Sequence, residues 1–140
     1  MSNHSQPVLA IGAVVFHEDR VLLVQRKNPP NAGQWAIPGG KVRLGETLQT
    51  AAEREIREET GITIRAREPV HTFELIQHDA LGEVLYHYVI IDLRAEYLDG
   101  QPSAADDARA AAWVDCQSLA TLTVNPETRR LLREKFNFGS

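Results

Sequence analysis

The sequence predicts a single α+β domain, an α/β/α sandwich in which a mixed β-sheet is flanked by helices. Apolar runs rich in β-branched residues recur as far as residue 114, strong helix formers interrupt them at residues 47–60, and an amphipathic segment follows residue 125. The length of 140 residues suits one domain. We expect this domain to span residues 1–140, with residues 1–7 as a flexible N-terminus.

The N-terminal part predicts a β-hairpin followed by a loop. Residues 8–16 and 21–24 are apolar runs separated by a polar turn, which is a hairpin signal. Residues 27–34 are rich in loop-forming residues, and residues 35–37 form a short apolar piece. The following residues 38–40, Pro-Gly-Gly, are expected to break regular structure again.

A helix is predicted from about Thr47 to Thr60, because this stretch holds mostly strong helix formers and no Pro or Gly. Leu48, Ala52 and Ile56 share one face at a spacing of four residues. Gly61 follows where a left-handed residue would end the helix.

The C-terminal half predicts further strands and a closing helix. Strands are expected around residues 62–65, at 70–77, at 84–93 with an intervening turn, and at 111–114. Residues 94–109 are polar and turn-rich and then rich in alanine, so a helical turn is equally compatible with their propensities. Asn125-Pro126-Glu127 is a helix start, and Leu131, Leu132 and Phe136 mark the buried side of that helix.

Composition excludes several classes of protein. The net charge is −4, whereas binding to the phosphate backbone of duplex nucleic acid requires an excess of basic residues. No duplex nucleic acid is therefore expected as a partner. No apolar stretch is long enough to span a membrane, and none resembles a secretion signal, which predicts a cytoplasmic protein without a membrane partner. The single cysteine, Cys116, cannot form an internal disulfide and is expected to be a small buried side chain.

Acidic residues are concentrated in and before the predicted helix at residues 47–60. Glu58 lies roughly 60° to one side of Glu55 around the helix axis and Glu59 about 40° to the other, so the three carboxylates share a face. Such a face is either a solvated surface supported by arginines or a site for a hard divalent cation, which binds carboxylate oxygens. The preceding Gly39 and Gly40 favour the metal site, because glycine lets phosphate or metal approach the backbone closely.

Residues 40–62 resemble the signature of the Nudix hydrolases. The matching positions are Gly40, Glu46, Arg54-Glu55-Ile56, Glu58-Glu59 and Gly61-Ile62. Seven identities and two aliphatic positions at this spacing have a chance probability on the order of 10⁻⁷. The order of the strands also looks like that family, and the whole chain looks most like its short ADP-ribose pyrophosphatase-type members.

This resemblance implies a set of site residues. Glu55, Glu58, Glu59 and the carbonyl of Gly39 would bind Mg²⁺ or Mn²⁺, and Glu58 and Glu59 would act in catalysis. Glu46 and Arg54 would form an ion pair that fixes the loop against the helix. The general base is expected in a later loop, with Asp107 as the choice and Asp106 and Glu83 as competitors. Each of these three is equally compatible with a solvated loop acid.

Three further residues are candidate substrate contacts. Arg26 could bind a phosphate through its guanidinium fork, with a surface ion pair as the alternative. Trp35 could stack on a base or ribose, with a core position as the alternative. Lys41 follows the glycine pair and is a further candidate for contact with a phosphate.

The implied activity is hydrolysis of a pyrophosphate bond in a nucleoside diphosphate linked to another moiety. ADP-ribose, cleaved to AMP and ribose 5-phosphate, is the first substrate to test. The alternatives are a nucleoside-triphosphate pyrophosphatase that sanitises the nucleotide pool and a Nudix module that senses a nucleotide without cleaving it. Because dimers are common among similar enzymes, a homodimer is a further expectation.

Overall fold

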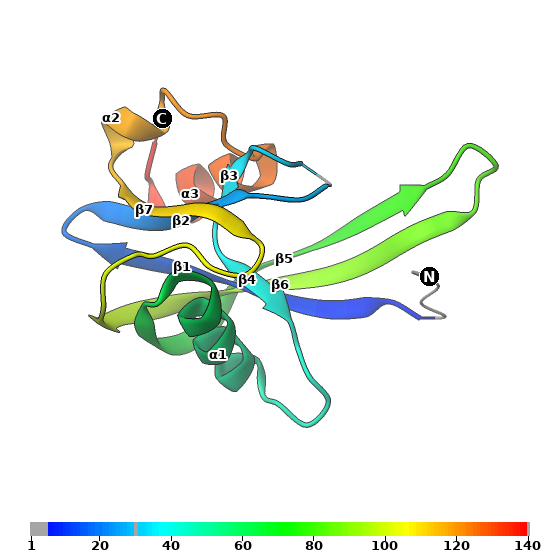
Figure 1. Cartoon of the computed structure of the whole chain (residues 1–140), viewed down its shortest axis with the longest axis horizontal. Helices are drawn as coiled ribbons and strands as arrows, with labels where there is room; N and C mark the ends of the chain where they lie inside the picture. The colour runs from blue at the N-terminus through cyan, green and yellow to red at the C-terminus, as the bar shows by residue number, and fades with distance from the viewer. Residues whose placement is uncertain (1–5, 30, 140) are drawn as a thin grey trace.

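A mixed β-sheet with a helix on each face forms the centre of the fold (Figure 1). The computed structural model describes residues 6–29 and 31–139. Within these residues the elements are β1 (Val8–His17), β2 (Arg20–Arg26), β3 (Trp35–Ala36), β4 (Gly39–Lys41), α1 (Leu48–Thr60), β5 (Thr63–His78), β6 (Val84–Asp99), β7 (Ala108–Val114), α2 (Cys116–Leu119) and α3 (Pro126–Phe136). Residues 1–5 of the expected flexible N-terminus lie outside the described residues.

Strand β1 lies in the middle of the sheet, whose order is β3-β2-β1-β6-β5. It pairs in parallel with β6 from Val8↔Tyr88 to Phe16↔Glu96, and antiparallel with β2 and β4. Strand β7 pairs antiparallel with β2. The long β5–β6 hairpin extends beyond the rest of the sheet (Figure 1).

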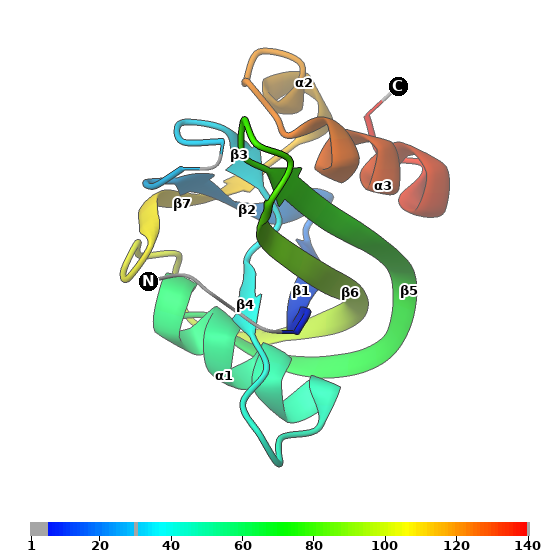
Figure 2. The same ribbon diagram turned by 90° about the vertical axis from the view of Figure 1, so that its right-hand side faces the viewer.

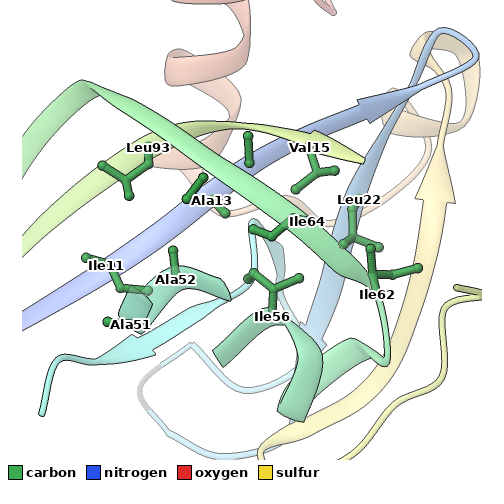
Figure 3. Close-up of a cluster of buried hydrophobic side chains, with 12 residues drawn as sticks. Ile11, Ala13, Val15, Leu22, Ala51, Ala52, Ile56, Ile62, Ile64 and Leu93 are labelled. Carbon is green, nitrogen blue, oxygen red and sulfur yellow. The ribbon is translucent and has the colours of Figure 1, made fainter. Parts of the chain in front are cut away.

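The two faces of the sheet bury separate cores. The α1-side core contains alternate residues of β1, namely Ile11, Ala13 and Val15, together with Ile56 of α1 and Leu93 of β6 (Figure 3). The α3-side core contains residues from β1, β2, β7, α2, α3 and the segments next to α3: Val14, Val21, Leu23, Val114, Leu119, Val124, Leu131, Leu132 and Phe138. This arrangement confirms the predicted α+β fold class with its mixed sheet between helices.

Several predicted elements are confirmed with their capping residues. Thr47 caps α1 by accepting a hydrogen bond from the Thr50 N–H at 3.0 Å, and Gly61 ends the helix at a φ of 78°. Asn125 caps α3 by accepting from the Glu127 N–H at 3.0 Å, and Pro126 is its first residue. The predicted hairpin at the N-terminus is also present as β1 and β2.

The glycine pair behaves differently from its prediction. Gly39 and Gly40 do not break regular structure but belong to β4, which pairs with β1. A Cβ on Gly39 would collide with the carbonyl oxygen of Ile11. The glycines therefore permit a close approach of β4 to β1. The sequence alone does not distinguish this use of glycine from its use in a loop.

The second half of the sheet is longer than its sequence patterns predicted. Residues 63–78 form one strand, because register shifts around Pro69 absorb the proline within an edge strand. Strand β6 continues to Asp99, and residues 101–107 contain no helix. Strand β7 begins at Ala108, three residues before the predicted start.

Two details near the C-terminus were not predicted correctly. The short helix α2 was missed, although Asp115 caps it by accepting from the Ser118 N–H at 2.7 Å. Cys116 opens this helix and is exposed rather than buried. In the part of the chain that the structure describes, no helix is long and apolar enough to cross a membrane.

Candidate active site

The acidic face of α1 is oriented by the opposite, apolar face of the helix. Ala52 and Ile56 are completely buried in the α1-side core. This burial fixes the rotation of the helix and turns Glu55 and Glu59 towards β4. Glu58, one turn from Glu55 on the same face, remains exposed.

Strand β4 lies directly against this face. The Gly39 N–H donates a hydrogen bond to Glu59 Oε1 at 3.1 Å. A Cβ added to Gly40 would overlap the carboxyl group of Glu55. Both glycines are thus required by contacts, one with the backbone of β1 and one with a side chain of α1.

Arg54 joins the loop before α1 to the acidic face. Its Nε and Nη2 donate to the two carboxylate oxygens of Glu46 at 2.6 and 2.9 Å. Its Nη1 donates to Glu55 at 2.9 Å and to Glu58 at 3.1 Å, and Nη2 also donates to the Lys41 carbonyl at 3.0 Å. The Arg54 guanidinium holds the pKa of Glu46 at about 2, and the Glu46 carboxylate raises the pKa of Arg54. Arg54 therefore neutralises part of the carboxylate cluster as well as anchoring the loop.

Glu59 is the most buried of the three face carboxylates, with a relative exposure of 8%. Burial raises its pKa to about 7. The negative charges of Glu55 and Asp107 raise it further, whereas the Gly39 hydrogen bond and the positive charge of Arg26 oppose the shift. Four groups from four segments of the chain, namely β2, β4, α1 and the loop before β7, thus act on one carboxyl group.

The loop after β6 is fixed to the C-terminal end of α1. The Ser103 N–H donates to the Thr60 carbonyl at 2.8 Å, and the Ala105 N–H donates to the Glu59 carbonyl at 3.1 Å. These bonds satisfy two carbonyls that the end of a helix otherwise leaves unpaired. They also bring Asp107 close enough to Glu59 to influence its charge.

The three candidate bases lie at different places. The Asp107 carbonyl accepts from the Lys27 N–H at 3.0 Å, and its Oδ1 accepts from Asn28 at 3.4 Å. Asp106 has a φ of 55°, and its carbonyl accepts from the Lys27 ammonium at 3.0 Å. Glu83 belongs to the turn at the tip of the β5–β6 hairpin, far from α1 in both views (Figures 1 and 2). Asp107 therefore lies near the acidic face, where its charge acts on Glu59, whereas Glu83 is separated from that face.

The candidate substrate contacts are distributed around the same region. Arg26 ends β2 at a register shift and is half-buried. Trp35 is half-buried and packs against the α3-side core, as its core alternative predicts. Lys41 is exposed at the end of β4.

The donor set on α1 fits a hard divalent cation. Glu55, Glu58 and Glu59 offer oxygen ligands only, which are the ligands that Mg²⁺ and Mn²⁺ prefer. Burial raises the pKa of Glu55 and the neighbouring Glu58 charge adds to this increase, whereas Arg54 opposes it, so a cation bound here would favour the ionised carboxylate. Within the described residues no three His, Cys, Asp or Glu side chains converge on one point, so the fit is one of chemistry and charge.

Comparison with known proteins now adds to this geometry. The family model of the NUDIX domain matches residues 6–135. The chain belongs to the Nudix family. Its membership, its fold and its relatives make it a Nudix pyrophosphohydrolase, which confirms the resemblance seen in residues 40–62.

Individual Nudix relatives are similar over most of the chain. An ADP-ribose pyrophosphatase of Methanocaldococcus jannaschii is 33% identical over 86% of this chain and 69% of its own. An oxidized purine nucleoside triphosphate hydrolase of Danio rerio is 36% identical over 76% of this chain and 65% of its own. The crystal structure of a MutT Nudix hydrolase from Burkholderia pseudomallei has 32% identity and a TM-score of 0.71, covering 92% of this chain and 98% of that one.

Two contacts of this Nudix site were missed in the sequence. Arg54 was predicted to contact Glu46 alone, although its spacing of four residues from Glu58 predicts their ion pair. Asn28 contacts Asp107 from a position 79 residues away. No local pattern could have revealed that contact, because it depends on the pairing of β2 with β7.

Proposed function

We propose that this Nudix pyrophosphohydrolase cleaves ADP-ribose to AMP and ribose 5-phosphate with Mg²⁺ or Mn²⁺. The observation that carries the proposal is the packing of Glu55 and Glu59 against the glycine strand Gly39–Lys41, with Glu58 on the same face of α1. The similarity to the ADP-ribose pyrophosphatase of M. jannaschii supports this choice of substrate.

Each site residue has a part in the proposed reaction. When bound, the cation supplies positive charge at the phosphates and lowers the pKa of water. Glu55, Glu58, Glu59 and the Gly39 carbonyl would hold it. Asp107 would accept the proton of the attacking water at a carboxylate oxygen, as a P–O bond forms to that water and the anhydride bond breaks.

The remaining residues would bind and orient. Arg26 would donate hydrogen bonds to a phosphate, and Lys41 would add positive charge at the exposed end of β4. Arg54 would hold Glu46, Glu55 and Glu58 in place through the bonds described above. Trp35 would stack on the base or ribose of the nucleoside. We place this chemistry in the cytoplasm, because the lone cysteine suits a reducing compartment.

A second candidate is hydrolysis of nucleoside triphosphates to monophosphate and pyrophosphate. The similarity to the oxidized purine nucleoside triphosphate hydrolase of D. rerio favours it. A panel of ADP-ribose and nucleoside triphosphates with each metal separates the two candidates by their products. AMP with ribose 5-phosphate supports the first proposal, and release of pyrophosphate supports the second.

Glu58→Gln tests whether the acidic face performs the reaction. We expect turnover to fall by roughly 100-fold or more, because one anionic ligand is lost. Glu53→Gln is the matched control on the same helix, because a glutamine oxygen can still accept the Ala66 N–H that Glu53 accepts at 3.0 Å. Near-normal turnover in Glu58→Gln would refute the metal assignment. Nucleotide binding without hydrolysis across the whole panel would instead support the sensing module.

A further inference from the structure

A tight turn carries Asp107 from the end of α1 to the start of β7. The Ala105 N–H donates to the Glu59 carbonyl at 3.1 Å, which fixes the beginning of the turn to α1. The Ala108 N–H donates to the Ala105 carbonyl at 3.1 Å, and Ala108 begins β7. This second bond closes a β-turn whose central residues are Asp106 and Asp107. We call it the Asp107 turn.

The backbone of the Asp107 turn is in an uncommon conformation. Asp106 has a φ of 55°, whereas Asp107 does not have a positive φ. A positive φ at the first central residue alone is the pattern of a type II′ turn, in which glycine is the usual residue at that position. Because aspartate has a Cβ, this conformation needs support from the surrounding structure. Rotation of the peptide group between the two aspartates would change the turn type and the direction of the Asp107 side chain.

Lys27, the first residue after β2, contacts both central residues of the turn. Its backbone N–H donates to the Asp107 carbonyl at 3.0 Å, and its ammonium donates to the Asp106 carbonyl at 3.0 Å. The Asp106 carbonyl belongs to the peptide group between the two aspartates, so the ammonium opposes rotation of that group. This bond is charge-assisted and therefore stronger than one between neutral groups. Asn28, the next residue, donates to Asp107 Oδ1 at 3.4 Å.

We infer that Lys27 is a positioning residue, whose ammonium holds the Asp107 turn so that the Asp107 carboxylate stays near the acidic face of α1. This role rests on the proposed function, in which Asp107 accepts the proton of the attacking water. An exposed ammonium can instead bind a substrate phosphate, and kinetics separate the two roles. A misplaced base lowers kcat, whereas loss of a phosphate contact made equally in substrate and transition state raises KM.

Lys27→Met removes the ammonium and keeps an apolar stem of similar length. We expect kcat to fall about tenfold and KM to stay within about twofold of the wild type, measured with the substrate that the panel identifies. Lys27→Arg can still donate to the Asp106 carbonyl and should restore kcat to within about threefold. Lys135→Met, the same change at an exposed lysine of α3, is the matched control and should leave both constants unchanged. A higher KM with unchanged kcat in Lys27→Met would overturn the inference.

A double-mutant cycle shows whether Lys27 acts through Asp107. Asp107→Asn alone should lower kcat by roughly 100-fold or more, because asparagine cannot accept the proton. In that background Lys27→Met should lower kcat by less than about twofold, because no base is left to position. Near-normal kcat in Asp107→Asn would refute the base assignment of the proposed function and, with it, this role of Lys27. A low kcat in Asp107→Asn beside a normal kcat in Lys27→Met would overturn the inference alone, as would the full tenfold loss in both backgrounds.

Hydrogen exchange, followed by NMR on the full chain without substrate, measures the hold on the turn directly. The Ala108 amide, which closes the turn, should exchange at least about threefold faster in Lys27→Met than in the wild type, whereas the amides of α1 should keep their rates. Unchanged exchange at Ala108 would overturn the inference, because the ammonium would then not hold the turn. Circular dichroism verifies that each variant is folded.

Discussion

Replacing Asp92 by asparagine should change how the stability of the fold depends on pH. Asp92 lies on β6 with a relative exposure of 2%, on the side of the sheet that faces α3. The Asp92 carboxyl lies so close to Gly12 that a Cβ on Gly12 would collide with Asp92 Oδ1. Burial raises the pKa of Asp92 to about 7, the Glu127 charge adds to this increase, and His71 opposes it.

The sign follows from the protons bound by each state. Between the ordinary pKa of 3.8 and the raised value of about 7, the folded chain keeps the Asp92 proton and the unfolded chain has lost it. The free energy of unfolding therefore falls as pH rises through this window, by about 1.4 kcal/mol per pH unit. From a pH of about 5 to one of about 8.5 the loss is roughly 3 kcal/mol. Asparagine binds no proton, so Asp92→Asn should lack this loss.

Urea unfolding of metal-free protein, followed by circular dichroism at several pH values, measures the effect. Titration of Glu55 and Glu59 contributes equally to the wild type and the variant, so it cancels in the comparison. Asp99→Asn, an exposed residue of the same strand, is the control and should follow the wild-type curve. If wild type and Asp92→Asn differ by the same amount at every pH, within about 0.5 kcal/mol, the reasoning is wrong.

Three further predictions concern the site and the α1-side core. Gly40→Ala should weaken Mn²⁺ binding by roughly tenfold or more in titration calorimetry, because its Cβ displaces the Glu55 carboxyl; unchanged affinity would contradict this contact. Ile56→Ala should lower the free energy of unfolding by about 2–5 kcal/mol, measured by urea titration, because Ile56 is fully buried. Removing divalent metal with a chelator should abolish hydrolysis and leave the circular dichroism spectrum unchanged, since both cores are apolar. A chelator that unfolds the chain would show that the metal is structural.

The elements with strong local signals could be predicted from the sequence. Helix α1 has a capping threonine, a left-handed glycine and an apolar face, all of which act within a few residues. The extent of β5 and β6 could not be predicted, because it depends on their pairing with each other and on bulges that absorb Pro69. Strand β4 could not be predicted for a related reason. Its two glycines have no strand propensity of their own and form a strand because they pair with β1.

In the candidate site, too, local spacing predicts some features and tertiary contacts determine the others. The helical spacing of Glu55, Glu58 and Glu59 places them on one face without any tertiary information. Their surroundings depend on contacts between distant segments. The hydrogen bond from Gly39 spans 20 residues, and the approach of Asp107 needs the loop after β6 to dock on α1. The sequence alone therefore could not show which of the three candidate bases, Asp106, Asp107 and Glu83, lies near the acidic face.

The parallel pairing of β1 with β6 has a consequence for biosynthesis. Each paired residue of β6 is made about 80 positions after its partner in β1. The whole glutamate signature is translated before β6, at a stage when β1 lacks one of its two long neighbours. A nascent chain that ends at the turn between β5 and β6 would contain all of residues 40–62. It would still lack β6, and with it the complete sheet that positions these residues. Because such long-range contacts form slowly, the capacity to bind a cation should emerge late, after β6 has been synthesised and has paired with β1.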